Sequence, residues 1–183
     1  MRLWLLRHAR PLVGEGVCYG ALDLEADATE TMEAARQAAQ LLPSGVEVLS
    51  SPLRRCVQLA QALAALRPHL APREDARLAE MDFGSWEGRR WDSIDRAELE
   101  GWTSDFQAYR TGGHGESVSQ FMTRVGQALE EGCAAGRDEA WITHGGLFKA
   151  VLLHLAATPA AAASDWPRES LAHGAWHLFH IGV

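Results

Sequence analysis

The sequence predicts an α/β fold, a three-layer sandwich in which a mostly parallel sheet has helices on both faces. Short apolar runs typical of buried strands alternate along the chain with longer segments of helical periodicity. The 183 residues are enough for one domain with a substantial core and few for two. We therefore expect a single domain over residues 1–183, with a cap-like insert at about 80–116.

The first strand and the first helix follow from an apolar run, a loop and a helix stop. Residues 2–7 are typical of a buried strand, and the segment 8–28, with its proline and glycines, is expected to be a loop. A helix is expected over 29–42, with Thr29 as its N-cap and Pro43-Ser44-Gly45 after its end.

The second strand and helix lie close together. Residues 46–51 form another apolar run, which predicts a buried strand. Ser51 followed by Pro52 is typical of an N-cap and the first position of a helix. That helix should bury apolar side chains at helical spacing, namely Leu53, Cys56, Val57, Ala60, Leu63 and Ala64.

The rest of the chain continues the alternation around one irregular stretch. Residues 80–116 are rich in Gly and Trp and are expected to be irregular, with one or two short helices. The other expected elements are a short strand near 73–78, a helix over 117–134, a strand over 139–144, a helix over 146–156, an Ala- and Pro-rich connection over 158–163 and a final strand over 174–181.

The composition of the chain restricts the classes of partner that it is expected to bind. The chain has 17 basic and 24 acidic residues and a net charge of −7, whereas binders of nucleic acid or anionic membranes carry a basic excess. No apolar stretch approaches the roughly 20 residues of a membrane span, and the N-terminal apolar run is short for a signal peptide. The three cysteines match neither a zinc pattern nor a disulfide framework. We expect a cytoplasmic protein that binds no nucleic acid, membrane, metal or cofactor; the sequence carries no signal for an oligomeric state.

Polar side chains follow three predicted strands at the point where each strand ends. Arg7 and His8 end the first strand, Ser51 ends the second, and Arg54 and Arg55 lie in the helix turn after it. His144 ends the strand over 139–144. Because ligands of such sheets gather at the carboxyl ends of the strands, we expect these side chains to meet at one edge.

These residue types suit a phosphomonoester dianion. Arginine binds phosphate oxygens in pairs and keeps its charge, and a neutral imidazole can attack phosphorus. Two glycines, Gly145 and Gly146, follow His144 at the start of a predicted helix, where backbone N–H groups and the helix dipole favour an anion. The expected partner is therefore a small-molecule phosphomonoester.

Ordered motifs extend this interpretation to a family. They are Arg7-His8, Tyr19-Gly20-Ala21-Leu22-Asp23, Ser50-Ser51-Pro52-Leu53-Arg54-Arg55-Cys56, Glu80-Met81-Asp82-Phe83-Gly84-Ser85-Trp86-Glu87-Gly88, Gly115-Glu116-Ser117 and Ile142-Thr143-His144-Gly145-Gly146. From Leu3 to about Leu155 the chain resembles the histidine phosphatase superfamily, which has the phosphoglycerate mutase-like fold. Within it, the chain is most similar to the α-ribazole phosphatase type of cobalamin biosynthesis.

The resemblance implies a role for each motif. His8 would be the nucleophile that forms a phosphohistidine, and Glu80 would donate a proton to the leaving alcohol. The equatorial phosphate oxygens would be held by Arg7, Arg55 and His144. Three further residues are candidates for substrate contacts: Gly145, Arg10 and Tyr19. The implied substrate is α-ribazole 5′-phosphate, and no cofactor is implied.

Departures from the family pattern leave the substrate open. Ala9-Arg10-Pro11 follows the first histidine, where most members have glycine and then an acidic or amide residue. A phosphoglycerate mutase or a broad-specificity sugar phosphatase on the same fold is one alternative. A catalytically silent module that binds a phosphorylated ligand is another, from a different class.

The remaining histidines and tryptophans have simpler expected roles. We expect surface or core positions for His69, His154, His173, His177 and His180, whereas His114 lies in a glycine-rich segment near the expected pocket. We expect core positions for Trp4, Trp141 and Trp176. Trp86, Trp91 and Trp102 would either anchor the insert or stack on a heteroaromatic leaving group. Arg89, Arg90 and Lys149 are expected to be solvated surface charges.

Overall fold

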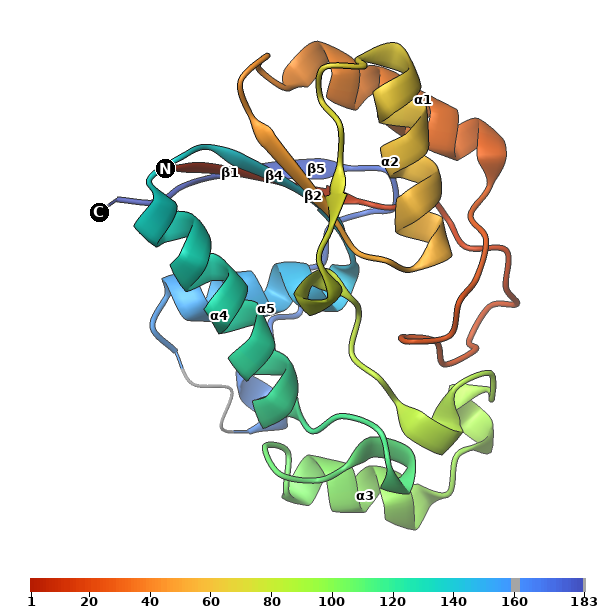
Figure 1. Cartoon of the computed structure of the whole chain (residues 1–183). Helices are drawn as coiled ribbons and strands as arrows, with labels where there is room; N and C mark the ends of the chain where they lie inside the picture. Colours follow the sequence, from red (N-terminus) through yellow and green to blue (C-terminus); the bar gives the residue numbers. More distant parts are fainter. Residues whose placement is uncertain (159–161, 183) are drawn as a thin grey trace.

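The computed structural model describes residues 1–158 and 162–182 and has the expected three layers (Figure 1). Within those residues a five-stranded sheet has the order β3-β2-β4-β1-β5. The strands are β1 (Arg2–Arg7), β2 (Glu47–Ser50), β3 (Arg73–Glu74), β4 (Glu139–Thr143) and β5 (Trp176–His180). All neighbouring pairs are parallel except β1 and β5, which are antiparallel. The prediction of a mostly parallel α/β sheet is therefore confirmed.

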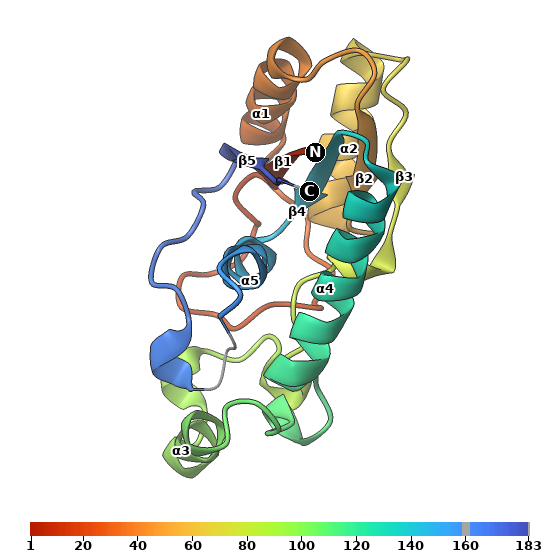
Figure 2. The same ribbon diagram turned by 90° about the vertical axis from the view of Figure 1, so that its left-hand side faces the viewer.

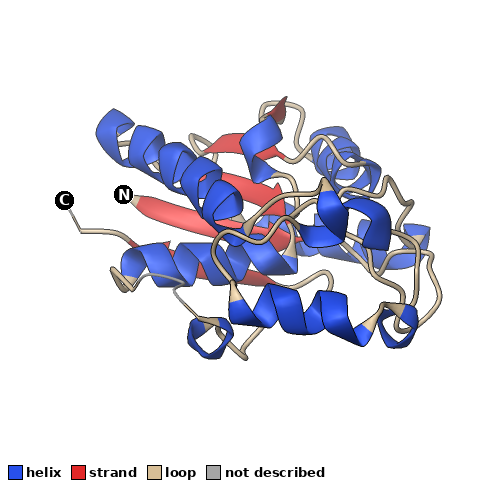
Figure 3. Cartoon of the chain, turned by 90° about the horizontal axis from the view of Figure 1, so that it is seen from below, coloured by secondary structure: helices blue, strands red, loops and turns tan. Residues whose placement is uncertain are grey.

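Two helices cover each face of the sheet. Helices α1 (Ala28–Leu41) and α2 (Arg54–Leu66) lie on one face, and α4 (Val118–Ala135) and α5 (Gly145–Leu155) lie on the other (Figure 2). From the α4 and α5 side, the strands lie behind the helices (Figure 3). Successive side chains of a strand point to opposite faces, so Trp4 packs with the α1 and α2 layer and Leu5 with the α4 and α5 layer.

Two helix starts differ from the sequence-based expectation. Asp27, rather than Thr29, caps α1, because its carboxylate accepts the N–H of Glu30. Helix α2 begins at Arg54, so Pro52 is not its first residue. The Arg54 N–H donates to the Asp23 carboxylate at 2.6 Å, which supplies the cap from another segment.

The predicted strand near 73–78 is shorter than expected. Only Arg73–Glu74 pairs with β2, and residues Ala76–Leu78 form a 3₁₀ turn, η1. Asp75 caps this turn, and Arg77 binds the same carboxylate, which holds the pKa of Asp75 below its ordinary value. Ser117, the first residue of the helix predicted over 117–134, is its N-cap and forms a capping box with Gln120. The connection predicted over 158–163 lies partly outside the described residues.

The segment 80–116 contains one α-helix and several short 3₁₀ turns. These are η2 (Gly84–Trp86), η3 (Trp91–Ser93), α3 (Arg96–Ser104) and η4 (Thr111–Gly113). Trp86 is fully buried in a cluster with Cys18 and Ile94, so it anchors the segment to the loop before α1. Cys18 thus lies in a core.

Trp176 does not lie in the core as expected. It is 41% exposed, because β5 is an edge strand whose first residues face solvent, whereas Trp4 and Trp141 are buried. Among the residues that the structure describes, none of the helices has the length and apolar character that a membrane crossing requires.

Candidate active site

Three strands deliver their following residues to one edge of the sheet. The N–H of His8 donates to Thr143 O at 3.1 Å, and the N–H of Ser51 donates to Ile142 O at 2.9 Å. The parallel pairing thus continues one residue beyond β1 and β2. His8, Ser51 and His144 are therefore neighbours although they lie far apart in the sequence.

Arg55 is the centre of this edge and is completely buried. Its Nε lies 3.2 Å from His8 Nε2 and 3.3 Å from His144 Nδ1. Its Nη1 donates to Leu22 O at 2.9 Å and its Nη2 to Gly20 O at 2.6 Å. The guanidinium therefore joins both histidines to the loop before α1.

His8 is held as a neutral imidazole with a defined tautomer. Its Nδ1 lies 2.7 Å from Ala9 O, so this nitrogen carries the proton and Nε2 carries the lone pair. Burial and the charge of Arg55 hold the pKa of His8 well below its ordinary value. A buried imidazole with an unprotonated Nε2 is suited to nucleophilic attack.

His144 is buried beside His8, with ring centroids 5.0 Å apart. Because Arg55 donates toward Nδ1, the proton is on Nε2, which lies 2.8 Å from Ser51 Oγ. Burial and Arg55 also hold the pKa of His144 well below its ordinary value. Both histidines are therefore neutral in the unliganded protein.

Glu80 lies against the N-terminus of α5. Its Oε2 accepts the N–H of Gly146 at 2.9 Å and its Oε1 accepts the N–H of Met81 at 3.1 Å. A Cβ on Gly146 would lie 2.2 Å from Glu80 Oε1, so only glycine leaves room for the carboxylate. Arg124 binds the backbone carbonyl of Glu80 at 2.9 Å and the Glu116 carboxylate at 2.7 Å. The Gly-Glu-Ser motif thus supports the segment that carries Glu80, through an arginine that sequence reasoning missed.

Arg7 reaches toward the segment before β5. Its Nη1 donates to Leu171 O at 2.5 Å, and Ser170 Oγ lies 3.4 Å away. In the described part of the chain its Nε is buried without a hydrogen-bond partner. A charged group with an unmet N–H donor at this edge is ready for an anion.

A cavity of about 550 Å³ opens over these residues. His8, Arg7, Glu80, Tyr19 and Gly145 line it, whereas Arg55 and His144 lie buried beneath them. The Arg55 guanidinium carbon lies 5.5 Å from the centroid of the Tyr19 ring.

Aromatic side chains form much of the remaining wall of the cavity. The aromatic members are Tyr19, Phe83, Trp91, Trp102, Phe106, Phe121 and Trp166. Lys149 also lines it and is half-buried, which lowers its pKa, so it is not the solvated surface charge expected from the sequence.

Two sequence-based candidates lie elsewhere. The Arg10 side chain is 72% exposed and its guanidinium lies 3.4 Å from Glu30, so it lies over α1 rather than in the cavity. His114 is exposed, because the turn η4 directs it to solvent. Residue identity near a motif does not determine the direction of a side chain.

His173 is the neighbour that sequence reasoning missed. Its ring centroid lies 5.5 Å from that of His8, although a surface or core role was expected. The antiparallel direction of β5 carries the preceding segment back to the carboxyl end of β1. Recognising that the last strand runs antiparallel to the first would have identified this residue.

Within the described residues, no cluster of three or more His, Cys, Asp or Glu side chains could hold a metal ion. The groups that meet at this edge of the sheet are arginines, neutral imidazoles, a carboxylate and the N-terminus of α5. Together they can bind an anion and exchange protons with it.

The chain is similar to known proteins in sequence and in structure. A sequence model described as "Histidine phosphatase superfamily (branch 1)" matches residues 3–179. The chain is 30% identical over 158 residues to "Putative phosphoserine phosphatase 2" of Hydrogenobacter thermophilus, covering 82% of this chain and 76% of that protein. The structure of mycobacterial glucosyl-3-phosphoglycerate phosphatase is similar, with a TM-score of 0.80, 27% identity, and coverage of 97% of this chain and 88% of that chain. TTHB049 from Thermus thermophilus gives a TM-score of 0.74, 30% identity, and coverage of 97% and 92%.

Proposed function

The chain belongs to the histidine phosphatase superfamily, branch 1, and is a phosphatase, and we propose that it hydrolyses phosphomonoesters through a phosphohistidine on His8. The observation that carries the proposal is the state of His8. Its imidazole is neutral, its Nδ1–H is bound to Ala9 O, and its Nε2 lone pair lies beside a buried arginine. An imidazole held in this way is prepared for attack on an electrophile.

The first half of the reaction forms the phosphoenzyme. His8 Nε2 bonds to phosphorus while the bond from phosphorus to the ester oxygen breaks. Glu80, protonated at this stage, gives its proton to the leaving oxygen, which departs as the alcohol. Glu80 then remains as a carboxylate, stabilised by the N–H of Gly146 at the N-terminus of α5.

The second half regenerates the enzyme. Glu80 removes a proton from water as the water oxygen bonds to phosphorus and the bond to His8 Nε2 breaks. Inorganic phosphate leaves, and Glu80 is protonated again. Arg7, Arg55 and His144 stabilise the negative charge of the phosphoryl oxygens in both steps.

The side chains that line the cavity indicate which kind of leaving group it could bind. Trp91 and Trp102 lie nearly parallel, with centroids 6.3 Å apart and planes 13° apart, and both face a cavity of about 550 Å³. A cavity of this size and apolar character suits a leaving group with an aromatic ring. We therefore propose α-ribazole 5′-phosphate, with a role in cobalamin biosynthesis, as the substrate.

Lys149 favours a second candidate substrate class. A half-buried ammonium group in the cavity wall would pair with a carboxylate on the leaving group. The names of two similar proteins refer to phosphoserine and glucosyl-3-phosphoglycerate, both of which carry a carboxylate. Carboxylated phosphomonoesters are therefore the alternative to α-ribazole 5′-phosphate.

A phosphate-release assay distinguishes these substrates. The panel is α-ribazole 5′-phosphate, a nucleoside monophosphate, a sugar phosphate, phosphoserine and 3-phosphoglycerate. We expect the highest kcat/KM for α-ribazole 5′-phosphate, because its benzimidazole can stack in the aromatic cavity. A higher value for phosphoserine or 3-phosphoglycerate would select the carboxylated class, and isomerisation of phosphoglycerate without phosphate release would indicate a mutase. A folded chain that binds phosphate but turns over no substrate would be a silent binding module.

The state of the cysteines supports a proposal for the cellular compartment of the protein. In the described structure all three are free, and burial raises the pKa of Cys18 and of Cys56 to about 12, so these thiols are unreactive. We propose the cytoplasm, where thiols stay reduced. We also propose that residues 1–183 act as one domain in which the segment 80–116 covers the cavity.

A further inference from the structure

The segment before β5 is attached directly to the nucleophile's strand. Arg7 N–H donates to Ala175 O at 2.9 Å, and Gly174 N–H donates to His8 O at 3.0 Å. These two bonds continue the antiparallel pairing of β1 with β5 beyond the end of β1. The backbone directly after His173 is therefore fixed relative to His8.

The side chain of His173 lies between His8 and Tyr19. Its ring centroid is 5.5 Å from that of His8, and its Nε2 lies 3.5 Å from the Tyr19 hydroxyl. Tyr19 in turn lies against the Arg55 guanidinium and lines the cavity. His173 is half-buried and lines two hollows that adjoin the cavity, one shared with Arg7 and the other with Tyr19.

His173 and Tyr19 together have one hydrogen-bond donor that the contact between them does not use. A tyrosine O–H and a neutral imidazole N–H are two donors, and a contact between the two groups uses only one of them. Their separation of 3.5 Å is long for a strong hydrogen bond, as is common before a ligand binds. When the Tyr19 hydroxyl donates to Nε2, the spare donor is the Nδ1–H of His173, and a phosphoryl oxygen entering beside His8 would give it an acceptor.

We propose that His173 is a phosphate-binding residue, which donates an N–H to a non-bridging phosphoryl oxygen while phosphate is transferred to and from His8. This role rests on the proposed phosphohistidine mechanism. It would add a neutral donor, paired with Tyr19, to the two arginines and to His144.

The charged surroundings of His173 agree with a neutral donor. Burial and Arg7 lower its pKa to about 4, with Arg10 and Arg55 acting in the same direction and Glu30 opposing them. The other titratable groups that face its ring are His8 and Tyr19. The ring is therefore neutral near pH 7 and keeps one N–H.

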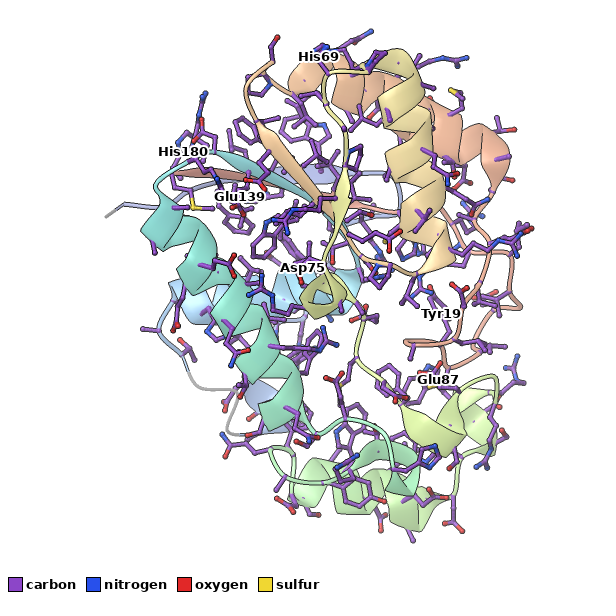
Figure 4. All side chains as sticks on the ribbon, viewed as in Figure 1. Tyr19, His69, Asp75, Glu87, Glu139 and His180 are labelled. Atoms are coloured by element: carbon purple, nitrogen blue, oxygen red, sulfur yellow. The ribbon has the colours of Figure 1, made fainter. Side chains whose placement is uncertain are left out.

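Two substitutions and one control test the proposal with p-nitrophenyl phosphate as substrate and orthovanadate as inhibitor. His173→Ala removes the donor, and His173→Asn places an amide N–H near the position of Nδ1. His180→Ala is the matched control, because His180 is exposed at the other end of β5, distant from Tyr19 in Figure 4.

We expect His173→Ala to lower kcat/KM and raise the vanadate inhibition constant about 10- to 100-fold, the effect of losing one hydrogen bond to a charged group. His173→Asn should restore most of both values, and the control should match the parent chain. If His173→Ala changes kcat/KM or the vanadate constant less than about twofold, or if only the Tm changes, the proposal is wrong.

A second measurement does not depend on a variant that folds. In the parent chain, inorganic phosphate should move the ring N–H resonance of His173 downfield in nitrogen-15 NMR spectra. Phosphate that shifts the His8 ring signals and leaves those of His173 unchanged would overturn the proposal. A parent chain that binds phosphate at His173 but hydrolyses no ester would overturn the proposed function instead.

Discussion

Arg55 donates its Nε–H toward His8 Nε2 at 3.2 Å, and this contact determines which ring nitrogen of His8 can react. A guanidinium has no acceptor, so the nitrogen that faces it must carry the lone pair. The opposite nitrogen is already bound to Ala9 O. Arg55 therefore orients the candidate nucleophile, and burial together with the charge of Arg55 keeps it unprotonated by lowering its pKa.

Glu87 should affect the contact between Arg55 and His8 through the loop that holds Arg55. Its carboxylate accepts the N–H groups of Gly20, Ala21, Leu22 and Phe83 at 2.8, 2.9, 3.1 and 2.9 Å. Gly20 and Leu22 supply the carbonyls that hold Arg55, and Figure 4 shows Glu87 beside the Tyr19 loop.

We expect Glu87→Gln to lower both the Tm and kcat/KM, the latter roughly 10-fold or more, because an amide N–H₂ would then face backbone donors. Phosphate-release kinetics and thermal unfolding measure the two effects, with the exposed Glu130→Gln as control. Unchanged kcat/KM in Glu87→Gln would show that this loop does not affect the function of Arg55.

Replacing Gly146 should leave the fold intact but lower the activity. A Cβ there would lie 2.2 Å from Glu80 Oε1 and would displace the carboxylate. Alanine is a better helix former than glycine by about 1 kcal/mol, so α5 itself should tolerate the change.

We therefore expect Gly146→Ala to lower kcat at least 10-fold with little loss of Tm, the loss approaching that of a general acid. Gly45→Ala is the control, since no atom lies within 4 Å of its added Cβ. Full activity in Gly146→Ala would mean that the position of Glu80 is unimportant.

Replacing Glu80 itself should make catalysis depend on the leaving group. General acid catalysis typically contributes about 10²–10⁴-fold, so Glu80→Gln should lose about that factor with alkyl phosphates. p-Nitrophenolate departs without a proton, so its phosphate ester should lose much less activity in the first step. The measurement is kcat/KM for both ester types, and an equal loss for the two would argue against Glu80 as proton donor.

Stability should fall on mild acidification. His8, His144 and His173 all have pKa values below the ordinary value of about 6.5, with burial as the main cause. Below about pH 6.5 the unfolded chain takes up protons that the folded chain refuses. The free energy of unfolding is therefore complete above pH 6.5 and falls as the pH drops toward the folded pKa values.

For each of the two buried residues, His8 and His144, the slope can reach about 1.4 kcal/mol per pH unit. Urea unfolding at pH 7.5, 6.5 and 5.5 without phosphate should show this decline. A smaller slope is expected in His173→Asn and an unchanged one in His180→Ala. Equal stability at all three pH values would contradict neutral buried histidines.

Much of the fold could be predicted because its signals are local. The apolar runs of β1 and β2 and the helical spacing after Ser117 are readable over a few residues. The start of α2 was misplaced because Asp23, thirty-one residues earlier, caps it in place of a neighbouring residue. A cap supplied across the fold leaves no mark in the adjacent sequence.

The site, too, could be predicted only in part from the sequence. His8, Arg55 and His144 could be placed at one edge because strand ends of a parallel sheet converge. His173 could not, since its position depends on β5 running antiparallel, and Lys149 could not, since the segment 80–116 had to be placed first. The outward direction of the Arg10 side chain could not be predicted, because it depends on Glu30 of α1.

The most direct test of the account is detection of phosphate on His8 during turnover. The enzyme is mixed with p-nitrophenyl phosphate, quenched in alkali, where phosphohistidine survives, and analysed by mass spectrometry of its peptides. The account predicts phosphate on the peptide that contains His8, lost on acid treatment, and neither adduct nor phosphate release in His8→Ala. Continued phosphate release by His8→Ala would contradict it.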